Sequence, residues 1–157
     1  IKEISGLEAE IKWPNDILIA NKKLGGILTE LNAEMDKINF VTIGIGLNVN
    51  NDKKNLMSSA TSLKEQKKES ISRITLLQEL LRRIEANYSL LENKDSSAIL
   101  EKWRRYNITL GKRVKVYAQK AHIEGEALDI DTDGGLLVRL DSGLLQKVMA
   151  GDVLHCR

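Results

Sequence analysis

The spacing of apolar residues changes twice along this 157-residue chain, and the change constrains its fold more than any other feature. Residues 8–50 contain short apolar runs and alternating apolar and polar positions, which are typical of β-strands. From 74 to 91, apolar residues recur every three or four positions, as in an amphipathic helix. From 111 to 155 the alternation returns. The chain is therefore expected to have an α+β fold, with an antiparallel or mixed sheet and packed helices followed by a second group of short strands.

The first group of strands is expected to form an antiparallel meander. Pro14, the only proline, should end the first strand because it has no N–H to donate to a neighbour. A two-residue turn is predicted at Asn21-Lys22, and Asp36 and Lys37 are predicted to turn the chain into the last of these strands. The polar stretch that follows the meander is predicted to be a flexible loop, residues 51–68. The strands are predicted at residues 8–13, 16–20, 23–32 and 38–50.

Two helices and a small barrel are expected after this loop. Ser70 or Ser72 can cap the first helix, which should pack on the sheet through Ile74, Leu77, Leu81, Ile84, Tyr88 and Leu91. A second helix is predicted at 96–106, with Trp103 docking it on the strands beyond. Those strands should form a closed or nearly closed SH3-like barrel, and they are predicted at 114–116, 123–130, 136–140, 144–148 and 153–155. The domain boundary is expected after Asn107, giving domains 1–107 and 108–157.

Composition excludes several classes of protein. The 24 basic and 22 acidic residues give a net charge of only +2, so no nucleic-acid or membrane-surface footprint is expected. No apolar run approaches the roughly 18 residues of a membrane span, and no signal peptide is visible, so a reducing cytoplasm is expected. Cys156 is the only cysteine, which excludes an internal disulfide. His122 and His155 are far apart and unaccompanied, so no metal site is predicted.

Polar residues gather at the ends of the first strands. Lys12-Trp13-Pro14-Asn15-Asp16 ends one strand with a proline and two turn formers, which fixes the direction of its polar groups. Lys23 precedes Leu24-Gly25-Gly26, where the absence of side chains lets a ligand approach the backbone. An ammonium group beside exposed backbone N–H groups suits an anionic or carbonyl-bearing ligand. Gly44 and Gly46 indicate a second stretch of backbone that a ligand can approach, on the next strand.

Three of these segments, in this order and spacing, resemble the biotin protein ligases. They are Lys12-Trp13-Pro14-Asn15-Asp16, the run from Lys23 to Glu30 (Lys-Leu-Gly-Gly-Ile-Leu-x-Glu), and the run from Gly44 to Asn50 (Gly-Ile-Gly-Leu-Asn-Val-Asn). The resemblance covers essentially the whole chain, including the helices and the C-terminal barrel. It implies a class II synthetase-like catalytic domain portion followed by an SH3-like domain.

The resemblance also implies an activity and a set of site residues. Such an enzyme joins biotin to ATP, giving biotinyl-5′-AMP and pyrophosphate, and passes the biotinyl group to a lysine of a biotin carboxyl carrier protein. Lys23 would stabilise negative charge in both steps, and Asp16 would orient it or assist the Mg²⁺-nucleotide. Gly25 and Gly26, with Lys23, would bind biotin. The nucleotide would be bound by Lys12, Asn15, Ile27 and Asn48.

One departure from the family pattern concerns the loop that folds over biotin. The family carries a Gly- and Arg-rich loop upstream of the Lys-Trp-Pro-Asn-Asp strand, and no Gly-Arg-Gly run exists in these 157 residues. We therefore expect the chain to be the C-terminal part of a ligase that needs an upstream segment for activity. The role of Arg157 and a homodimer through the sheet edge at 38–50 stay open.

Three alternatives remain at this stage. A lipoate or octanoate ligase shares the fold and the need for a lysine at the acyl-adenylate. A truncated module that only binds a partner protein would explain the missing loop, although the intact Lys12, Asn15, Lys23 and Asn48 argue against it. A nucleic-acid-binding barrel would need aromatic residues on a basic face, and residues 111–157 contain only Tyr117.

Overall fold

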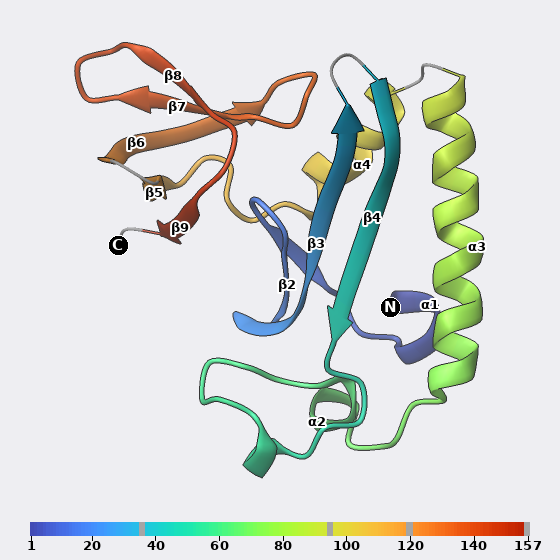
Figure 1. Ribbon diagram of the computed structural model, residues 1–157. Helices are drawn as coiled ribbons and strands as arrows, with labels where there is room; N and C mark the ends of the chain where they lie inside the picture. Colours follow the sequence, from blue (N-terminus) through green and yellow to red (C-terminus); the bar gives the residue numbers. More distant parts are fainter. Residues whose placement is uncertain (35–36, 94–95, 119–120, 156–157) are drawn as a thin grey trace. The chain divides into compact units, whose positions relative to one another are not determined.

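The computed structural model describes residues 1–34, 37–93, 96–118 and 121–155 of the chain (Figure 1). The chain divides into two compact units. The first unit comprises residues 1–9 and 15–76, and the second comprises residues 10–14 and 77–157. The mixture of helices and antiparallel sheets confirms the α+β fold class. The predicted domain boundary after Asn107 stays a prediction.

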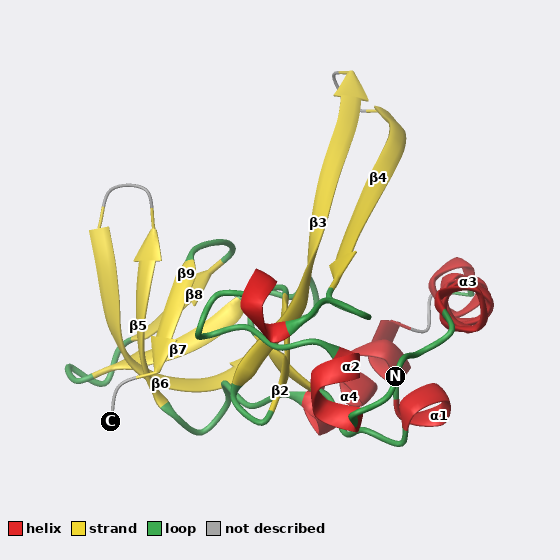
Figure 2. Cartoon of the chain, turned by 90° about the horizontal axis from the view of Figure 1, so that it is seen from below, coloured by secondary structure: helices red, strands yellow, loops and turns green. Residues whose placement is uncertain are grey.

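The first unit is built on an antiparallel meander of three strands. Strand β2 (Asp16–Ile19) pairs with β3 (Lys22–Glu34), and β3 pairs with β4 (Lys37–Leu47). Three short helices belong to the same unit: α1 (Lys2–Ser5), the 3₁₀ helix η1 (Lys53–Asn55) and α2 (Leu63–Lys67). Figure 2 shows the end of β3 and the start of β4 lying away from α1 and α2.

The core of the first unit lies at the opposite end of this hairpin. Five buried side chains form it, from β2, β3, α2, the start of α3 (Arg73–Glu92) and the segment between these two helices: Ile19, Leu24, Leu63, Leu76 and Ile71. Ile1, Ile4 and Leu7 pack against them from the N-terminal segment. The core therefore holds the β2–β3 turn firmly, because Ile19 and Leu24 flank it on both sides.

The second unit is a five-stranded antiparallel sheet with helices. Its strands follow the order β8-β7-β6-β5-β9. The strands are β5 (Arg113–Ala118), β6 (Ala121–Ile130), β7 (Leu136–Leu140), β8 (Leu145–Val148) and β9 (Asp152–His155). Strand β1 (Glu10–Lys12), most of α3 (Arg73–Glu92) and α4 (Ser96–Tyr106) belong to the same unit. The predicted closure of these strands into an SH3-like barrel stays a prediction.

The core of the second unit is a buried apolar cluster with one tryptophan. Trp13 lies in it beside apolar side chains of β5 to β9, namely Val114, Val116, Ala127, Ile130, Leu136, Val138, Val148 and Val153. Trp103 of α4 packs against this cluster, as predicted. The tryptophan of the Lys-Trp-Pro-Asn-Asp motif is therefore a core residue of the second unit.

Most predicted elements are confirmed, and some of their details are wrong. The turn between β2 and β3 lies at Ala20 and Asn21, which both have positive φ (49° and 60°), so Lys22 already belongs to β3. Positive φ at both central residues is the two-residue turn that suits the twist of a hairpin. Strand β4 ends at Leu47 rather than at Asn50. Residues 51–68, predicted to be a flexible loop, contain η1 and α2.

The amphipathic helix forms where predicted, but its apolar side chains are exposed. Ser72 caps α3, since its hydroxyl accepts a hydrogen bond from the N–H of Thr75 (3.3 Å). Ile74 is 72% exposed and Leu81 57%, and the same face includes Leu77, Ile84, Tyr88 and Leu91. This face is therefore exposed in the described structure, and its packing on the sheet stays a prediction. None of the described helices is long and apolar enough to cross a membrane. Asp36, Cys156 and Arg157 lie outside the described residues.

Candidate functional site

A β-bulge brings Lys23 and Asp16 to the same face of the β2–β3 hairpin. Asp16 pairs with Gly26 and Ile17 with Gly25, but Leu18 pairs with Lys23, so the register shifts by one residue at Leu24. A bulge turns the following side chains to the other face of the strand. Lys23 Nζ lies 2.5 Å from Asp16 Oδ1. The Lys23 side chain is 53% exposed and that of Asp16 27%, so the ammonium group is oriented by a carboxylate and remains open to solvent.

The backbone of Lys23 is held by a segment that is far away in the sequence. The Lys23 N–H donates to the carbonyl of Ser59, and the Lys23 carbonyl accepts from the N–H of Thr61, both at 2.9 Å. Thr61 and Ser62 are fully buried, and Ser62 caps α2 by accepting from the N–H of Glu65 at 3.0 Å. The pattern Ser62-x-x-Glu65 is a capping box, a sequence signal for this helix that the interpretation as a flexible loop missed.

The two glycines of the Lys23 strand meet different surroundings. A Cβ on Gly25 would lie 2.2 Å from the carbonyl oxygen of Gly46, so a side chain there collides with the neighbouring strand. A Cβ on Gly26 would meet nothing closer than 3.5 Å, and its neighbours would be Asn15, Asp16 and Lys23. Gly25 is thus required by the sheet itself, whereas Gly26 leaves open space on the face of the Lys23–Asp16 pair.

Asn15 and Ile27 are tied to each other beside this pair. The Asn15 side-chain amide donates to the carbonyl of Ile27 at 2.7 Å, and the Ile27 N–H donates to the carbonyl of Asn15 at 3.0 Å. The amide nitrogen is therefore engaged, while the side-chain oxygen of Asn15 is left as an acceptor among the described contacts. Asn15, Asp16, Lys23, Gly26 and Ile27 form one contiguous group, which we call the hairpin site.

Asn48 follows β4 on the other side of the Lys23 strand. Its N–H donates to the carbonyl of Leu24 (2.9 Å), and its carbonyl accepts from the N–H of Leu63 (3.0 Å). These bonds fix its backbone between β3 and α2. Lys12 is the predicted site residue that lies in the second unit, in β1, and the structure fixes it only relative to that unit.

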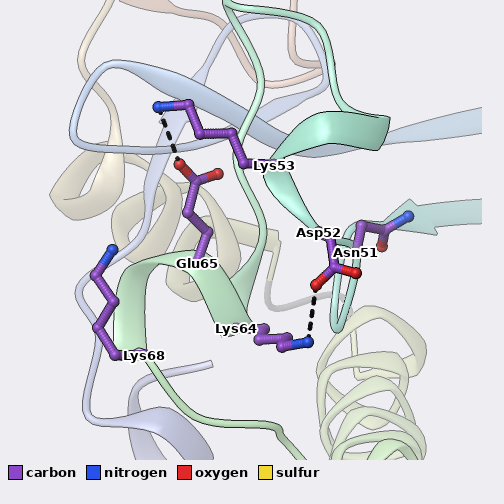
Figure 3. A pocket seen from close by; sticks show the side chains of 6 residues that line it. All are labelled: Asn51, Asp52, Lys53, Lys64, Glu65 and Lys68. Atoms are coloured by element: carbon purple, nitrogen blue, oxygen red, sulfur yellow. Dashed lines mark hydrogen bonds and ion pairs between the residues drawn. The ribbon is translucent and has the colours of Figure 1, made fainter.

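A polar cavity of about 230 Å³ lies in the first unit, beside α2 (Figure 3). Lys64 contacts Asp52 at 2.8 Å, and Lys53 contacts Glu65 at 3.5 Å. The hydrogen bond from Lys64 lowers the pKa of Asp52. Asn51 and Lys68 complete the lining, and none of the six residues was predicted to belong to the site. Because its carboxylates neutralise two of its three lysines, the cavity has no strong excess of charge.

His155 is the second unit's perturbed histidine. It is partly buried on β9, and its Nε2 is the one buried side-chain polar atom without a hydrogen-bond partner among the described residues. Burial lowers its pKa from the ordinary 6.5, and the positive charges of Lys112 and Lys12 add to this. Between pH 6.5 and the lowered native pKa of His155, the native state therefore binds fewer protons than the unfolded state.

We expect this histidine to make stability depend on pH. Its contribution is present above about pH 6.5 and is lost as the pH falls toward the lowered native pKa. Melting temperatures measured between pH 7.5 and pH 5 should fall in the wild type. The fall should be smaller in His155→Gln. His122→Gln, which replaces the exposed histidine, serves as the matched control and should retain the wild-type fall. Equal pH dependence in all three proteins would contradict the assignment.

Comparison with known proteins finds two family models that match separate regions of the chain. The model of the biotin/lipoate A/B protein ligase family matches residues 1–48, and that of the biotin protein ligase C-terminal domain matches residues 109–155. The first region contains the hairpin site, and the second contains the five-stranded sheet.

Curated relatives match nearly the whole chain. The bifunctional ligase/repressor BirA of Bacillus subtilis is 36% identical over 98% of the chain, and the biotin–[acetyl-CoA-carboxylase] ligase of Mycobacterium tuberculosis is 34% identical over 96%. The chain spans about half the length of these relatives, 48% and 54% respectively.

Solved structures agree with these relatives in fold. The apo biotin protein ligase of Aquifex aeolicus is 27% identical with a TM-score of 0.82, covering 99% of this chain and 68% of that one. The same ligase has been solved in complex with biotin and ATP, with a TM-score of 0.80. By its two matched regions, its relatives and its fold, the chain belongs to the biotin protein ligase family.

Proposed function

We propose that the chain is part of an ATP-dependent biotin protein ligase. The reaction joins the biotin carboxylate to the α-phosphate of ATP and releases pyrophosphate. The biotinyl group then passes from biotinyl-5′-AMP to a lysine of a biotin carboxyl carrier protein. The names of the relatives and the biotin and ATP complex of the Aquifex ligase support this activity. The observation that carries the proposal is the exposed Lys23 ammonium, oriented by Asp16 on the open side of Gly26.

Lys23 is the proposed electrostatic catalyst of both steps. In the first step negative charge builds up on the phosphorus centre, and in the second on the tetrahedral carbon that the carrier lysine attacks. A preorganised cation at that point lowers both barriers without reorganising during the reaction. Asp16 keeps the ammonium in place, since the two groups are 2.5 Å apart. No covalent enzyme intermediate is required, because the adenylate itself is the activated species.

The remaining site residues are proposed to bind the two substrates. The space left by Gly26, and the backbone of Gly25 beside it, would accommodate the biotin chain. Asn15 and Ile27, held together by two hydrogen bonds, would contact the nucleotide, and so would Asn48 and Lys12. The described residues contain no group of three or more His, Cys, Asp or Glu side chains that could hold a metal. Mg²⁺ is proposed to enter with the ATP phosphates, a common mode for this ion.

The exposed apolar face of the β3–β4 hairpin indicates that another protein segment packs on the first unit. Directly paired residues share a face in an antiparallel sheet. Ile27 pairs with Ile45, Thr29 with Ile43 and Leu31 with Val41, so one face is almost entirely apolar. Leu31 is 61% exposed, Ile43 54% and Val41 49%. Burying a large apolar side chain stabilises a protein by about 1.5–3 kcal/mol, so a face of this size indicates a covering partner.

We propose that an upstream segment of the ligase covers this face. The chain spans 48% and 54% of the length of two relatives, so a ligase of their length has further sequence that can pack there. A second copy of the chain, pairing along the free edge of β4, is the competing arrangement. Sedimentation of the chain alone and with the upstream segment distinguishes them. A complex of one chain with one segment is expected, and a stable homodimer that excludes the segment would contradict it.

Biotin-dependent exchange of labelled pyrophosphate into ATP tests the proposed reaction. The chain is combined with the upstream segment in trans, and exchange is expected only when biotin is present. Exchange driven by lipoate or octanoate instead would favour the lipoate ligase alternative, which the match to the biotin protein ligase C-terminal domain disfavours. A complex that forms but catalyses no exchange would favour a module that only binds a partner.

A further inference from the structure

The backbone around Lys12 is fixed on both sides by the second unit. The carbonyl of Ile11 accepts hydrogen bonds from the N–H of Ile108 (2.9 Å) and from the side chain of Asn107 (3.3 Å). On the other side, the N–H of Trp13 donates to the hydroxyl of Thr109 at 3.0 Å, in a buried position. Lys12 lies between these two anchors, and its own side chain is partly exposed.

Trp13 is the stronger of the anchors. It is only 3% exposed, within the core cluster of the second unit, and its indole N–H donates to the carbonyl of Gly134 at 3.0 Å. Thr109 is fully buried, and its N–H donates to Asn107 Oδ1 at 2.7 Å. Asn107 therefore joins both anchors into one network. A side chain in such a network has little freedom to move without breaking buried hydrogen bonds.

We propose that Trp13 and Thr109 are positioning residues that hold Lys12 for the nucleotide, so that the second unit takes part in the ligase reaction. This inference rests on the proposed function. Through Thr109 and the core around Trp13, the second unit would then help to position a nucleotide-binding lysine.

The electrostatics around Lys12 support a role in binding an anion. No carboxylate lies within ion-pair distance of Lys12 in the described part of the chain, whereas Lys23 has Asp16. Burial lowers the pKa of His155, and the positive charges of Lys112 and Lys12 act in the same direction. Lys12 therefore faces a neighbourhood without a compensating carboxylate, and an ATP phosphate would supply the missing negative charge.

Substitution of Thr109 tests the proposal without removing Lys12. Thr109→Val keeps the shape and removes the acceptor of the Trp13 N–H, while Thr109→Ser keeps the hydroxyl. The ligase is assembled from the chain and the upstream segment, and pyrophosphate exchange is measured over ranges of ATP and biotin. Because small misplacements of a binding group reduce efficiency strongly, Thr109→Val should raise the KM for ATP about tenfold or more and leave the KM for biotin unchanged. Thr109→Ser should restore the wild-type values.

The control for a purely structural effect is Val138→Ala. Val138 is fully buried in the same cluster, and its truncation destabilises the unit without touching either hydrogen bond to Trp13. It should lower the melting temperature and leave the KM for ATP unchanged. Two results would overturn the positioning role and leave the proposed function intact. One is an equal KM for ATP in wild type and Thr109→Val, and the other is a KM for ATP that rises in Val138→Ala as well. Absence of exchange in the wild type would overturn the proposed function, and the positioning role with it.

Discussion

Replacing Lys23 by alanine is expected to slow formation of the adenylate by a factor of about 10²–10³. Removal of a single preorganised donor from a site where negative charge develops typically costs about 2.7–4 kcal/mol of barrier. The Lys23 side chain is 53% exposed, so the loss of its ion pair with Asp16 should change the stability of the fold little. The measurement is the biotin-dependent pyrophosphate exchange rate of the ligase assembled with its upstream segment, with melting temperatures recorded in parallel.

The matched control for this prediction is the neighbouring lysine. Lys22→Ala removes the same charge one residue earlier in β3, where Lys22 pairs with Ile19 at the turn. It should leave the exchange rate within about twofold of wild type, since surface substitutions away from special features are close to neutral. If both variants lose activity equally, the effect comes from net charge or folding, and Lys23 has no special role.

The second large effect is expected at Gly25, on stability. The Cβ of an alanine at this position would lie 2.2 Å from the carbonyl oxygen of Gly46 and 3.1 Å from the Cα of Leu47. Both are backbone atoms of β4, so the strands must separate to admit it. Overpacking of this kind typically costs about 1–3 kcal/mol. Urea denaturation of Gly25→Ala should show a correspondingly lower midpoint.

Gly26→Ala provides the contrast, because it adds the same methyl group to open space. Its nearest neighbours would be the Asn15 carbonyl and Asp16 Oδ1, both at 3.5 Å, which is ordinary contact. Its denaturation midpoint should equal that of the wild type, while its affinity for biotin should fall because the methyl group occupies the space proposed for the ligand. A stable Gly25→Ala, or a Gly26→Ala that unfolds early, would refute the different roles of the two glycines.

The period of the apolar residues was sufficient to predict most of the fold. Strand β7 and helix α4 lie at 136–140 and 96–106, as the alternation and the helical spacing predict. The prediction of a flexible loop at 51–68 is wrong because it rests on polar composition, whereas Ser62 and Glu65 carry a local capping signal for α2. The turn at Ala20-Asn21 differs by one residue from the prediction because alanine rarely takes positive φ, so the sequence favoured Asn21-Lys22.

The sequence predicts that polar residues gather on this hairpin, but it does not predict the geometry that brings them together. Lys23, Asp16 and Gly26 come together as a group, but the bulge at Leu24 that turns Lys23 toward Asp16 has no local sequence signal. The sequence predicts Trp13 at the end of a strand. Nothing near it in the sequence indicates that Thr109 and Gly134 accept its hydrogen bonds. Contacts between residues about a hundred positions apart depend on tertiary structure, which a periodicity cannot reveal.

Titration calorimetry with biotinyl-5′-AMP tests the central claim most directly. The wild-type chain and the Lys23→Ala variant are each titrated alone and with the upstream segment added in trans. We predict weak or no binding to the chain alone, tight binding once the segment is present, and loss of most of that affinity in Lys23→Ala. Failure of the assembled wild-type protein to bind the adenylate would contradict the account, and so would equally tight binding by Lys23→Ala.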